Sequence, residues 1–244
     1  MNRDSNGYTF GFAAAMVLVV ASVLAFTAST LKDLQAENVR KEKMQNILST
    51  IGIKTDREGA EKLFNEYIVE QLALKNDGTV DTTVDAFSEI DLAIELKKNP
   101  QEQRFPLYVA NVESAQYYII PLRGAGLWNA IWGYIALNED KNSIKGVVFD
   151  HQGETAGLGA EITQQWFMDR FLEEKIFDAS GALVGITVSK TNNDPNDTDK
   201  DDHEVDAISG ATITGDGVSD MIIERLQHYL PYLKAKPADI AYNN

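Results

Sequence analysis

The stretch Asp206-Ala-Ile-Ser-Gly-Ala-Thr-Ile-Thr214 lies just before a strongly helical pattern and is the most informative part of this chain of 244 residues. The small residues Ser209, Gly210 and Ala211 let the backbone approach a bulky group closely. A helix N-terminus offers free N–H groups and a favourable dipole to a phosphate. Thr212 stands at that junction, with its hydroxyl available for modification. An ordinary Ser/Gly/Thr turn that caps a helix is the competing interpretation.

The segments around this stretch combine short strands with two amphipathic helices. Strand patterns that begin near Leu107 cover residues 117–122, 133–137, 144–149 and 185–189. Helical spacing of apolar residues covers residues 163–177 and 215–233, and Pro231 and Pro237 mark the end of the second helix. Together they predict an α+β domain with an antiparallel sheet and flanking helices.

The N-terminal part of the chain has a different composition. No charged residue occurs from Gly7 to Leu31, and a membrane-spanning helix needs about 20 apolar residues. A cleaved secretory signal is the alternative, with Val23-Leu-Ala25 as its small-residue cleavage site. A retained anchor is favoured, because Arg3 is the only basic residue before the segment and the apolar run exceeds the usual ~7–15 residues of a signal.

The segment between anchor and domain is helical and then polar. Residues 31–51 continue the anchor with mixed charges, residues 58–74 show helical spacing, and residues 76–105 are expected to form a polar surface excursion. The predicted organisation is a short tail (1–6), a transmembrane helix (7–31), a helical and polar connecting segment (32–105), the main domain (106–234) and a C-terminal tail (235–244).

Composition excludes several functions. A net charge of −15 argues against binding to nucleic acid and against docking on anionic lipid. Cysteine is absent, which excludes disulfides, thiolate catalysis and Cys-ligated metal centres. The three histidines lack ligand spacing, and no nucleophile–base–acid arrangement is visible, so we expect neither a metal site nor a catalytic triad. Asp197-Thr-Asp-Lys-Asp201 begins like a calcium loop, but Asp202 occupies the required glycine position, so residues 192–204 are interpreted as a solvated acidic loop.

Two further motifs lie between the predicted strands. In the first, residues 151–160, two glycines flank Leu158, which suits a flat aromatic ligand whose face is covered by the leucine. A plain loop with Leu158 in the core is the alternative. In the second, residues 124–133, Trp128 is a candidate for stacking on such a ligand, and a core tryptophan is the alternative.

These motifs carry a resemblance to the FMN-binding domain family. Asp-x-x-Ser-Gly-Ala-Thr at residues 206–212 resembles the family's flavinylation signature. Residues 154–159 resemble its Glu-Thr-Pro-Gly-Leu-Gly loop, with Ala156 in place of the proline, and residues 124–128 resemble its Gly-x-Gly-Leu-Trp stretch. The three motifs occur in the family's order and cover residues 107–232.

The resemblance implies a cofactor and a set of contacts. One FMN would be joined to Thr212 through a phosphoester by a flavin transferase. Thr214 would cap the helix and bond a phosphate oxygen, while Asp206 would be a recognition or metal-binding element for the transferase. The remaining residues implied at the flavin are Ser209, Gly210 and Ala211 near the phosphate, and Trp128, Glu154, Thr155, Gly157, Leu158 and Gly159 around the ring.

The resemblance also implies a role in a membrane redox complex. Within the family, the chain is similar to the C subunits of Na⁺-translocating NADH:quinone oxidoreductases, with the G subunits of Rnf complexes as the alternative. The long segment between residues 40 and 105 favours the former. Such a protein would relay electrons between redox centres of neighbouring subunits during NADH oxidation and quinone reduction coupled to Na⁺ export.

Orientation and flavin binding leave two alternatives open. The resemblance implies a bacterial inner-membrane protein with a single span and its domain on the periplasmic side. The positive-inside rule favours the opposite orientation, because four basic residues follow the anchor: Lys32, Arg40, Lys41 and Lys43. The rule is weak for long domains, which can cross the membrane regardless of charge. An anchored scaffold of the same fold without flavin is the alternative function.

Overall fold

The computed structural model describes residues 5–194, 198–235 and 242–243. It divides the chain into two compact units, residues 1–43 and 44–244. Helix α1 (Asn6–Thr50) supplies the described part of the first unit, and its last seven residues belong to the second.

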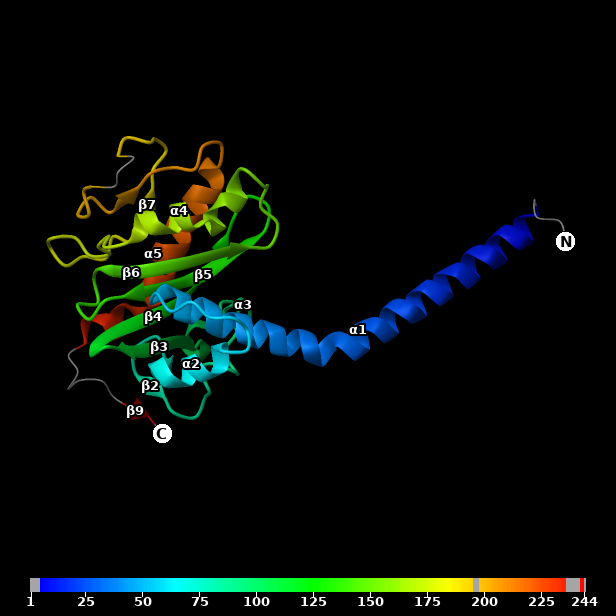
Figure 1. The fold of residues 1–244 in the computed structure, drawn as a ribbon, viewed down its shortest axis with the longest axis horizontal. Helices are drawn as coiled ribbons and strands as arrows, with labels where there is room; N and C mark the ends of the chain where they lie inside the picture. The colour runs from blue at the N-terminus through cyan, green and yellow to red at the C-terminus, as the bar shows by residue number, and fades with distance from the viewer. Residues whose placement is uncertain (1–4, 195–197, 236–241, 244) are drawn as a thin grey trace. The chain divides into compact units, whose positions relative to one another are not determined.

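The described part of the first unit is a continuous helix whose residues up to Leu31 are uncharged (Figure 1). Large side chains in the predicted transmembrane segment are exposed, including Phe10 at 74% and Leu18 at 67%. The helix is long and apolar enough to cross a membrane. The prediction that the helix continues beyond residue 31 is confirmed, because α1 runs without interruption to Thr50.

The second unit is built on a seven-stranded sheet with the order β6-β5-β4-β3-β1-β2-β9 (Figure 1). Every neighbouring pair is antiparallel except β2 and β9, which confirms the predicted antiparallel sheet and its strands at residues 117–122, 133–137 and 144–149. The strands are β1 (Ile68–Leu74), β2 (Val80–Asp81), β3 (Phe105–Val112), β4 (Ala115–Ala125), β5 (Ala130–Leu137), β6 (Ile144–His151) and β9 (Tyr242–Asn243).

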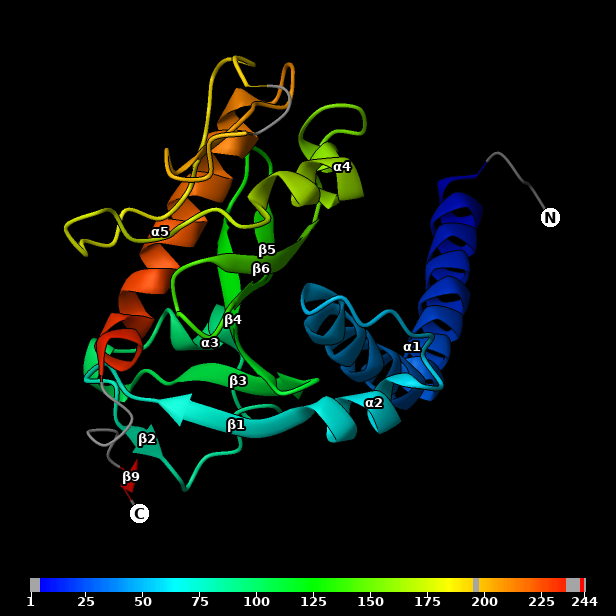
Figure 2. The same ribbon diagram turned by 60° about the vertical axis from the view of Figure 1, so that its left-hand side comes forward.

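Helix α5 (Thr212–Lys234) covers one face of this sheet (Figure 2). Gly217 lets it approach the end of β4 closely, since a Cβ at this position would clash with the carbonyl oxygen of Ala125. The side chains of α5 that are buried against the sheet follow the predicted helical spacing and include Val218, Ile222 and Leu226. The helix does not end at Pro231 but includes it, because a proline near the end of a helix removes only one of the last hydrogen bonds. Pro237 lies outside the described residues.

The opposite face of the sheet carries a second core. Alternating side chains of β3 divide between the two cores, with Leu107 on the α5 side and Tyr108 on the other. The end of α1 and helix α2 (Ala60–Tyr67) pack here (Figure 2). A Cβ on Gly146 would clash with the carbonyl oxygen of Thr50, so β6 and the end of α1 are in close contact. The buried members from α1 and the following turn are Met44, Ile47, Leu48 and Ile51.

The connecting segment differs from its prediction. The expected helix over residues 58–74 ends at Tyr67, and the β-branched Ile68 and Val69 open strand β1, which pairs with β3. The predicted surface excursion, residues 76–105, contributes β2, helix α3 (Leu92–Glu95) and the 3₁₀ helix η1 (Pro100–Glu102), and it buries Val80 and Ile90. The compact unit begins at Met44, so it contains most of the connecting segment together with residues 106–234, and its sheet includes β9 near the C-terminus.

The predicted helix over residues 163–177 is also wrong in its extent. The region holds only η2 (Gly159–Thr163), α4 (Gln165–Met168) and η3 (Asp169–Phe171). The N–H groups of Glu173 and Ile176 donate to the carbonyls of Ile144 and Asn142, so the backbone bonds to the β5–β6 region instead of continuing a helix. The predicted strand at 185–189 is reduced to β7 (Thr187–Val188), which pairs with β8 (Glu204–Val205) in a parallel ladder.

Candidate functional site

The three sequence motifs converge on the carboxylate of Glu154. One oxygen, Oε1, accepts from the backbone N–H of Trp128 at 3.0 Å. The other, Oε2, accepts from the hydroxyl of Thr214 at 2.7 Å. The backbone N–H of Glu154 donates to Nδ1 of His151 at 3.1 Å. Glu154 therefore joins the β4–β5 hairpin, the loop after β6 and the first turn of α5.

Glu154 is a buried anion, with 7% of its surface exposed. Burial favours the neutral form of the carboxyl group, but hydrogen bonds from the Trp128 N–H, the Thr214 hydroxyl and the Asn129 N–H lower its pKa below the usual value. The charge is thus matched by donors of the protein, and it fixes the position of three loops.

Two glycines make room for this carboxylate. A Cβ on Gly126 would lie 2.5 Å from Glu154 Oε1, and one on Gly159 would lie 2.5 Å from both Glu154 Oε2 and Thr214 Oγ1. These distances are too short for a non-bonded contact, so a side chain at either position would displace the carboxylate from its hydrogen bonds. The Gly-x-Gly and Gly-Leu-Gly patterns of the sequence have a packing role here.

Thr212 is the first residue of α5, and its side chain is exposed. Within the described residues, the backbone N–H groups of Thr212, Ile213 and Thr214 have no backbone acceptor, as is usual in the first turn of a helix. Thr214 does not cap the helix as predicted. The cap position is Ala211, and the Thr214 hydroxyl is buried and donates to Glu154.

Apolar side chains surround this helix start. Leu158 is exposed and lies next to Gly210, where a Cβ would come within 2.8 Å of its Cδ2. Gly210 has φ +74°, a conformation that favours glycine. Trp128 is 68% exposed, so it is not a core tryptophan, and its indole N–H donates to Thr155 Oγ1 at 3.1 Å. Ile213 is exposed as well.

Asp206 is buried beneath the turn that leads to Thr212. Its Oδ1 accepts from the N–H groups of Asn193 and Asp194, while its Oδ2 is buried with no partner among the described residues. Arg170 donates from Nη1 to the carbonyl of Asp206 at 2.6 Å. No group of three metal-binding side chains occurs in the part of the chain that the structure describes, and Asp197 of the calcium-like pattern lies outside it.

The sequence predicted most residues of this site but not three residues that hold them in place. Residues 128, 154–159 and 209–214 are brought into one region by the contacts above. The missed residues are His151, which accepts from the Glu154 N–H, Gly126, which admits the carboxylate, and Arg170, which holds the Asp206 turn. His151 and Gly126 lie inside the quoted motifs, whereas no local pattern marks Arg170.

The fold and this site define an FMN-binding domain. The model of the FMN-binding domain family matches residues 126–227, a range that includes Trp128, the loop at 154–159 and Thr212. A crystal structure of the C subunit of the Na⁺-translocating NADH-quinone reductase from Parabacteroides distasonis has a TM-score of 0.76 and 38% identity, covering 84% of this chain and 98% of that chain.

Relatives from other bacteria match over nearly the full length. The C subunit of the same reductase from Vibrio campbellii is 28% identical, covering 89% of both chains. The one from Neisseria meningitidis serogroup B is 29% identical, covering 95% of both chains. The chain belongs to the family of C subunits of the Na⁺-translocating NADH-quinone reductases.

Proposed function

We propose that this chain is a membrane-anchored flavoprotein subunit that carries one FMN, joined to the Thr212 hydroxyl through a phosphoester. The observation that carries the proposal is the position of Thr212: exposed, at the start of a 23-residue helix, and beside the free N–H groups of its first turn. Such a helix start stabilises a phosphate through donors and dipole together. The surrounding small residues, Ser209, Gly210 and Ala211, leave space for the group.

A covalent link fits the electrostatics of the protein. A net charge of −15 repels a free phosphate dianion, and the buried Glu154 carboxylate lies beneath the same helix start. A phosphodiester keeps only one negative charge, and a tether makes retention independent of affinity. Glu154 serves here by holding the loops in place, since both its oxygens already accept hydrogen bonds from the protein.

The flavin ring would lie among the apolar side chains around Thr212. Leu158 and Trp128 offer exposed apolar and aromatic surface, and Thr155 fixes the Trp128 indole through its hydroxyl. Gly159 packs closely against Glu154 and Thr214, whereas Gly157 has φ +76°, a conformation that favours glycine. The Gly157 N–H donates to Glu161 Oε1 at 3.1 Å. Asp206, buried with one free oxygen among the described residues, suits a role in recognition by the flavin transferase.

The proposed activity is electron transfer within a multi-subunit complex. FMN supplies a carrier that accepts and releases electrons singly or in pairs, and the protein supplies its position and surroundings. Relatives named as subunits of a Na⁺-translocating NADH-quinone reductase support partner subunits for this chain. We place the anchor in the bacterial inner membrane and the domain on the periplasmic side, with electrons relayed between redox centres of neighbouring subunits.

The test is the intact mass of the full chain co-expressed with an active flavin transferase. Wild type is expected to gain the mass of one FMN less water and to fluoresce in a denaturing gel. Thr212→Ala is expected to lose both signals, and Thr212→Ser to retain part of them because it keeps the hydroxyl. Wild type without adduct, beside a control substrate that the transferase modifies, would overturn covalent flavin and favour an anchored scaffold.

A further inference from the structure

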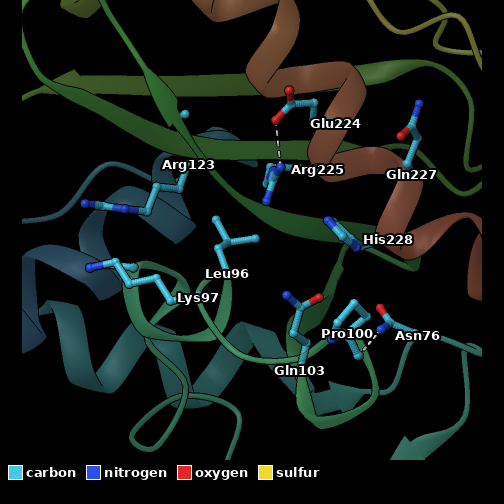
Figure 3. Close-up of a pocket in the computed structure, with 12 residues that line it drawn as sticks. Asn76, Leu96, Lys97, Pro100, Gln103, Arg123, Glu224, Arg225, Gln227 and His228 are labelled. Atoms are coloured by element: carbon cyan, nitrogen blue, oxygen red, sulfur yellow. Dashed lines mark hydrogen bonds and ion pairs between the residues drawn. The ribbon is translucent and has the colours of Figure 1, made fainter.

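A pocket of about 740 Å³ lies in the second unit, away from Thr212 (Figure 3). It is formed by the turn between β1 and β2, by α3 and the segment that follows it, by β4 and by the middle of α5. Arg225 on α5 lies 13 residues after Thr212, about 20 Å along the helix at 1.5 Å per residue. The residues that line it are Asn76, Ala93, Leu96, Lys97, Pro100, Gln103, Arg123, Gly124, Glu224, Arg225, Gln227 and His228.

The pocket is cationic in a strongly acidic protein. Three basic side chains line it, those of Lys97, Arg123 and Arg225, against the single carboxylate of Glu224. Figure 3 shows Arg225 at the centre of the pocket, with Arg123 and Lys97 extending along one side. Neither Lys97 nor Arg123 forms an ion pair with another described residue. The local positive charge is therefore not neutralised by the described part of the fold.

Arg225 is the decisive residue, because its guanidinium group is buried without enough partners. Only 8% of the residue is exposed, and its Nη2 donates to Glu224 Oε2 at 2.8 Å. Its Nε and Nη1 are buried and have no hydrogen-bond partner among the described residues. Buried cationic donors without acceptors cost free energy, which an oxyanion in the pocket would offset.

The positive charge of Arg225 also affects the neighbouring side chain of His228. It stacks on Phe105 with ring centroids 4.1 Å apart, at the edge of the pocket. Burial, followed by the positive charge of Arg225, lowers its pKa to about 4, so the ring is neutral at pH 7. It offers a flat, uncharged wall rather than another cation.

The remaining lining fits the body of a small organic molecule. Leu96 and Pro100 supply apolar surface, while the amides of Asn76, Gln103 and Gln227 supply donors and acceptors. The volume lies within the range of about 300–1,000 Å³ that is typical of small-molecule sites and exceeds what a single ion needs. Guanidinium groups recognise carboxylates and phosphates through paired N–H donors.

We propose that this pocket is a second ligand site, which binds a small soluble molecule through its phosphate or carboxylate group on Arg225, Arg123 and Lys97. The site is separate from Thr212, so it does not depend on the covalent flavin. An occupant would supply acceptors to the buried nitrogens of Arg225 that the described protein leaves without partners.

The experiment is calorimetric titration of the full chain, in uncharged detergent at low salt, with inorganic pyrophosphate and with citrate. Saturable binding of at least one anion with a Kd below about 1 mM is expected, together with a higher Tm. Arg225→Gln is expected to weaken binding by about tenfold or more, and Arg123→Gln by a smaller factor. Lys62→Gln, which removes one exposed charge from α2 outside the pocket, is expected to bind like wild type.

Three results would overturn the proposal. The first is no binding of either anion at about 10-fold the expected Kd. The second is equal affinity in wild type and in Arg123→Gln, whose partly exposed side chain makes loss of folding a poor explanation, with circular dichroism as the check. The third is loss of binding in Thr212→Ala, which would assign the signal to the flavin position. Retained binding in Thr212→Ala supports the pocket even if no FMN is ever attached.

Discussion

A single buried carboxylate organises the site at the scale of residues. Glu154 accepts one hydrogen bond from the hairpin that carries Trp128 and another from the helix that begins at Thr212. Because both oxygens are engaged, the side chain works as a connection between loops that are distant in sequence. Its charge is stabilised by donors, as its lowered pKa indicates.

Replacing Glu154 is therefore expected to cost both stability and flavin loading. Glu154→Ala leaves the Thr214 hydroxyl and the Trp128 N–H without their acceptors, which costs about 2–4 kcal/mol of unfolding free energy. Glu154→Gln keeps one acceptor and is expected to cost about half as much. Urea unfolding gives the free energies, and intact mass gives the flavinylated fraction.

The matched control is Glu161→Gln. Its side chain also accepts a backbone N–H in this loop, from Gly157 at 3.1 Å, but that contact is exposed. We expect an effect of about 0.5 kcal/mol or less, because the glutamine oxygen can still accept this bond and the contact is exposed. Equal losses in Glu161→Gln and Glu154→Ala would contradict the organising role of Glu154.

At the scale of elements, the sequence correctly predicted the strands and the helix that local residue patterns determine. The central strands and α5 follow from alternation and helical spacing, and the structure has them at those positions. The prediction of a helix over residues 68–74 was wrong, because its apolar spacing also fits a strand, and only pairing with β3 decides between them. Residues 172–177 likewise look helical until the carbonyls of Ile144 and Asn142 become available in the folded domain.

In the site, too, residues in local motifs could be predicted, whereas contacts between residues distant in sequence could not. Its motifs are local, so Thr212, Leu158 and Trp128 could be selected in advance. The bond between Thr214 and Glu154 joins residues 60 apart in sequence, and the prediction that Thr214 caps the helix failed because no local pattern reveals that partner. Arg225 was missed for a related reason: its buried nitrogens become evident only when the lining of the pocket is known.

Because α5 packs closely on β4, replacing one helical glycine by alanine is expected to destabilise the protein, whereas this replacement usually stabilises a helix. Gly→Ala inside a helix normally stabilises by about 1 kcal/mol. At Gly217 the new Cβ would clash with the Ala125 carbonyl oxygen, so the helix must shift. We expect Gly217→Ala to destabilise by about 1–3 kcal/mol in urea unfolding. Asp220→Ala, at an exposed position of α5, is the control and is expected to be neutral or slightly stabilising. A stabilised Gly217→Ala would contradict the close approach.

At the scale of the molecule, the end of α1 belongs to the folded domain. Met44, Ile47, Leu48 and Ile51 are each 4% exposed or less, and they pack with side chains from α2 and the sheet. A chain that begins at residue 44 is therefore expected to fold and to unfold cooperatively. A chain that begins at residue 54 loses these four side chains, at about 1.5–3 kcal/mol each, against a total of about 5–15 kcal/mol.

Calorimetry of the two shortened chains checks this boundary. The longer one is expected to give a single transition, and the shorter one a Tm that is lower by at least about 10 °C or no transition. Similar Tm values for both would show that the end of α1 is dispensable for folding of the domain. Because both shortened chains lack the apolar segment, detergent and lipid do not enter the comparison.

The partly buried ring of His228 makes the stability of the whole domain depend on pH. Its pKa is about 4 in the folded state, because of burial and the charge of Arg225, and about 6.5 when unfolded, while Glu224 opposes the shift. Between these values the unfolded chain binds more protons than the folded one, so the free energy of unfolding falls as the pH falls from about 6.5 to about 4. Since the ring is only partly buried, solvent screening reduces the effect to about 1–2 kcal/mol.

The variant His228→Gln isolates this contribution. Carboxylates also titrate in acid, but they are common to both proteins, so the difference between wild type and variant belongs to the ring. Urea unfolding at about pH 7 and about pH 4.5 is expected to show a larger loss in wild type, even though the variant starts lower because it lacks the stack on Phe105. Identical losses would mean that His228 titrates alike in both states. Occupation of the cationic pocket by pyrophosphate should then shrink the difference, since an anion beside the ring favours its protonated form.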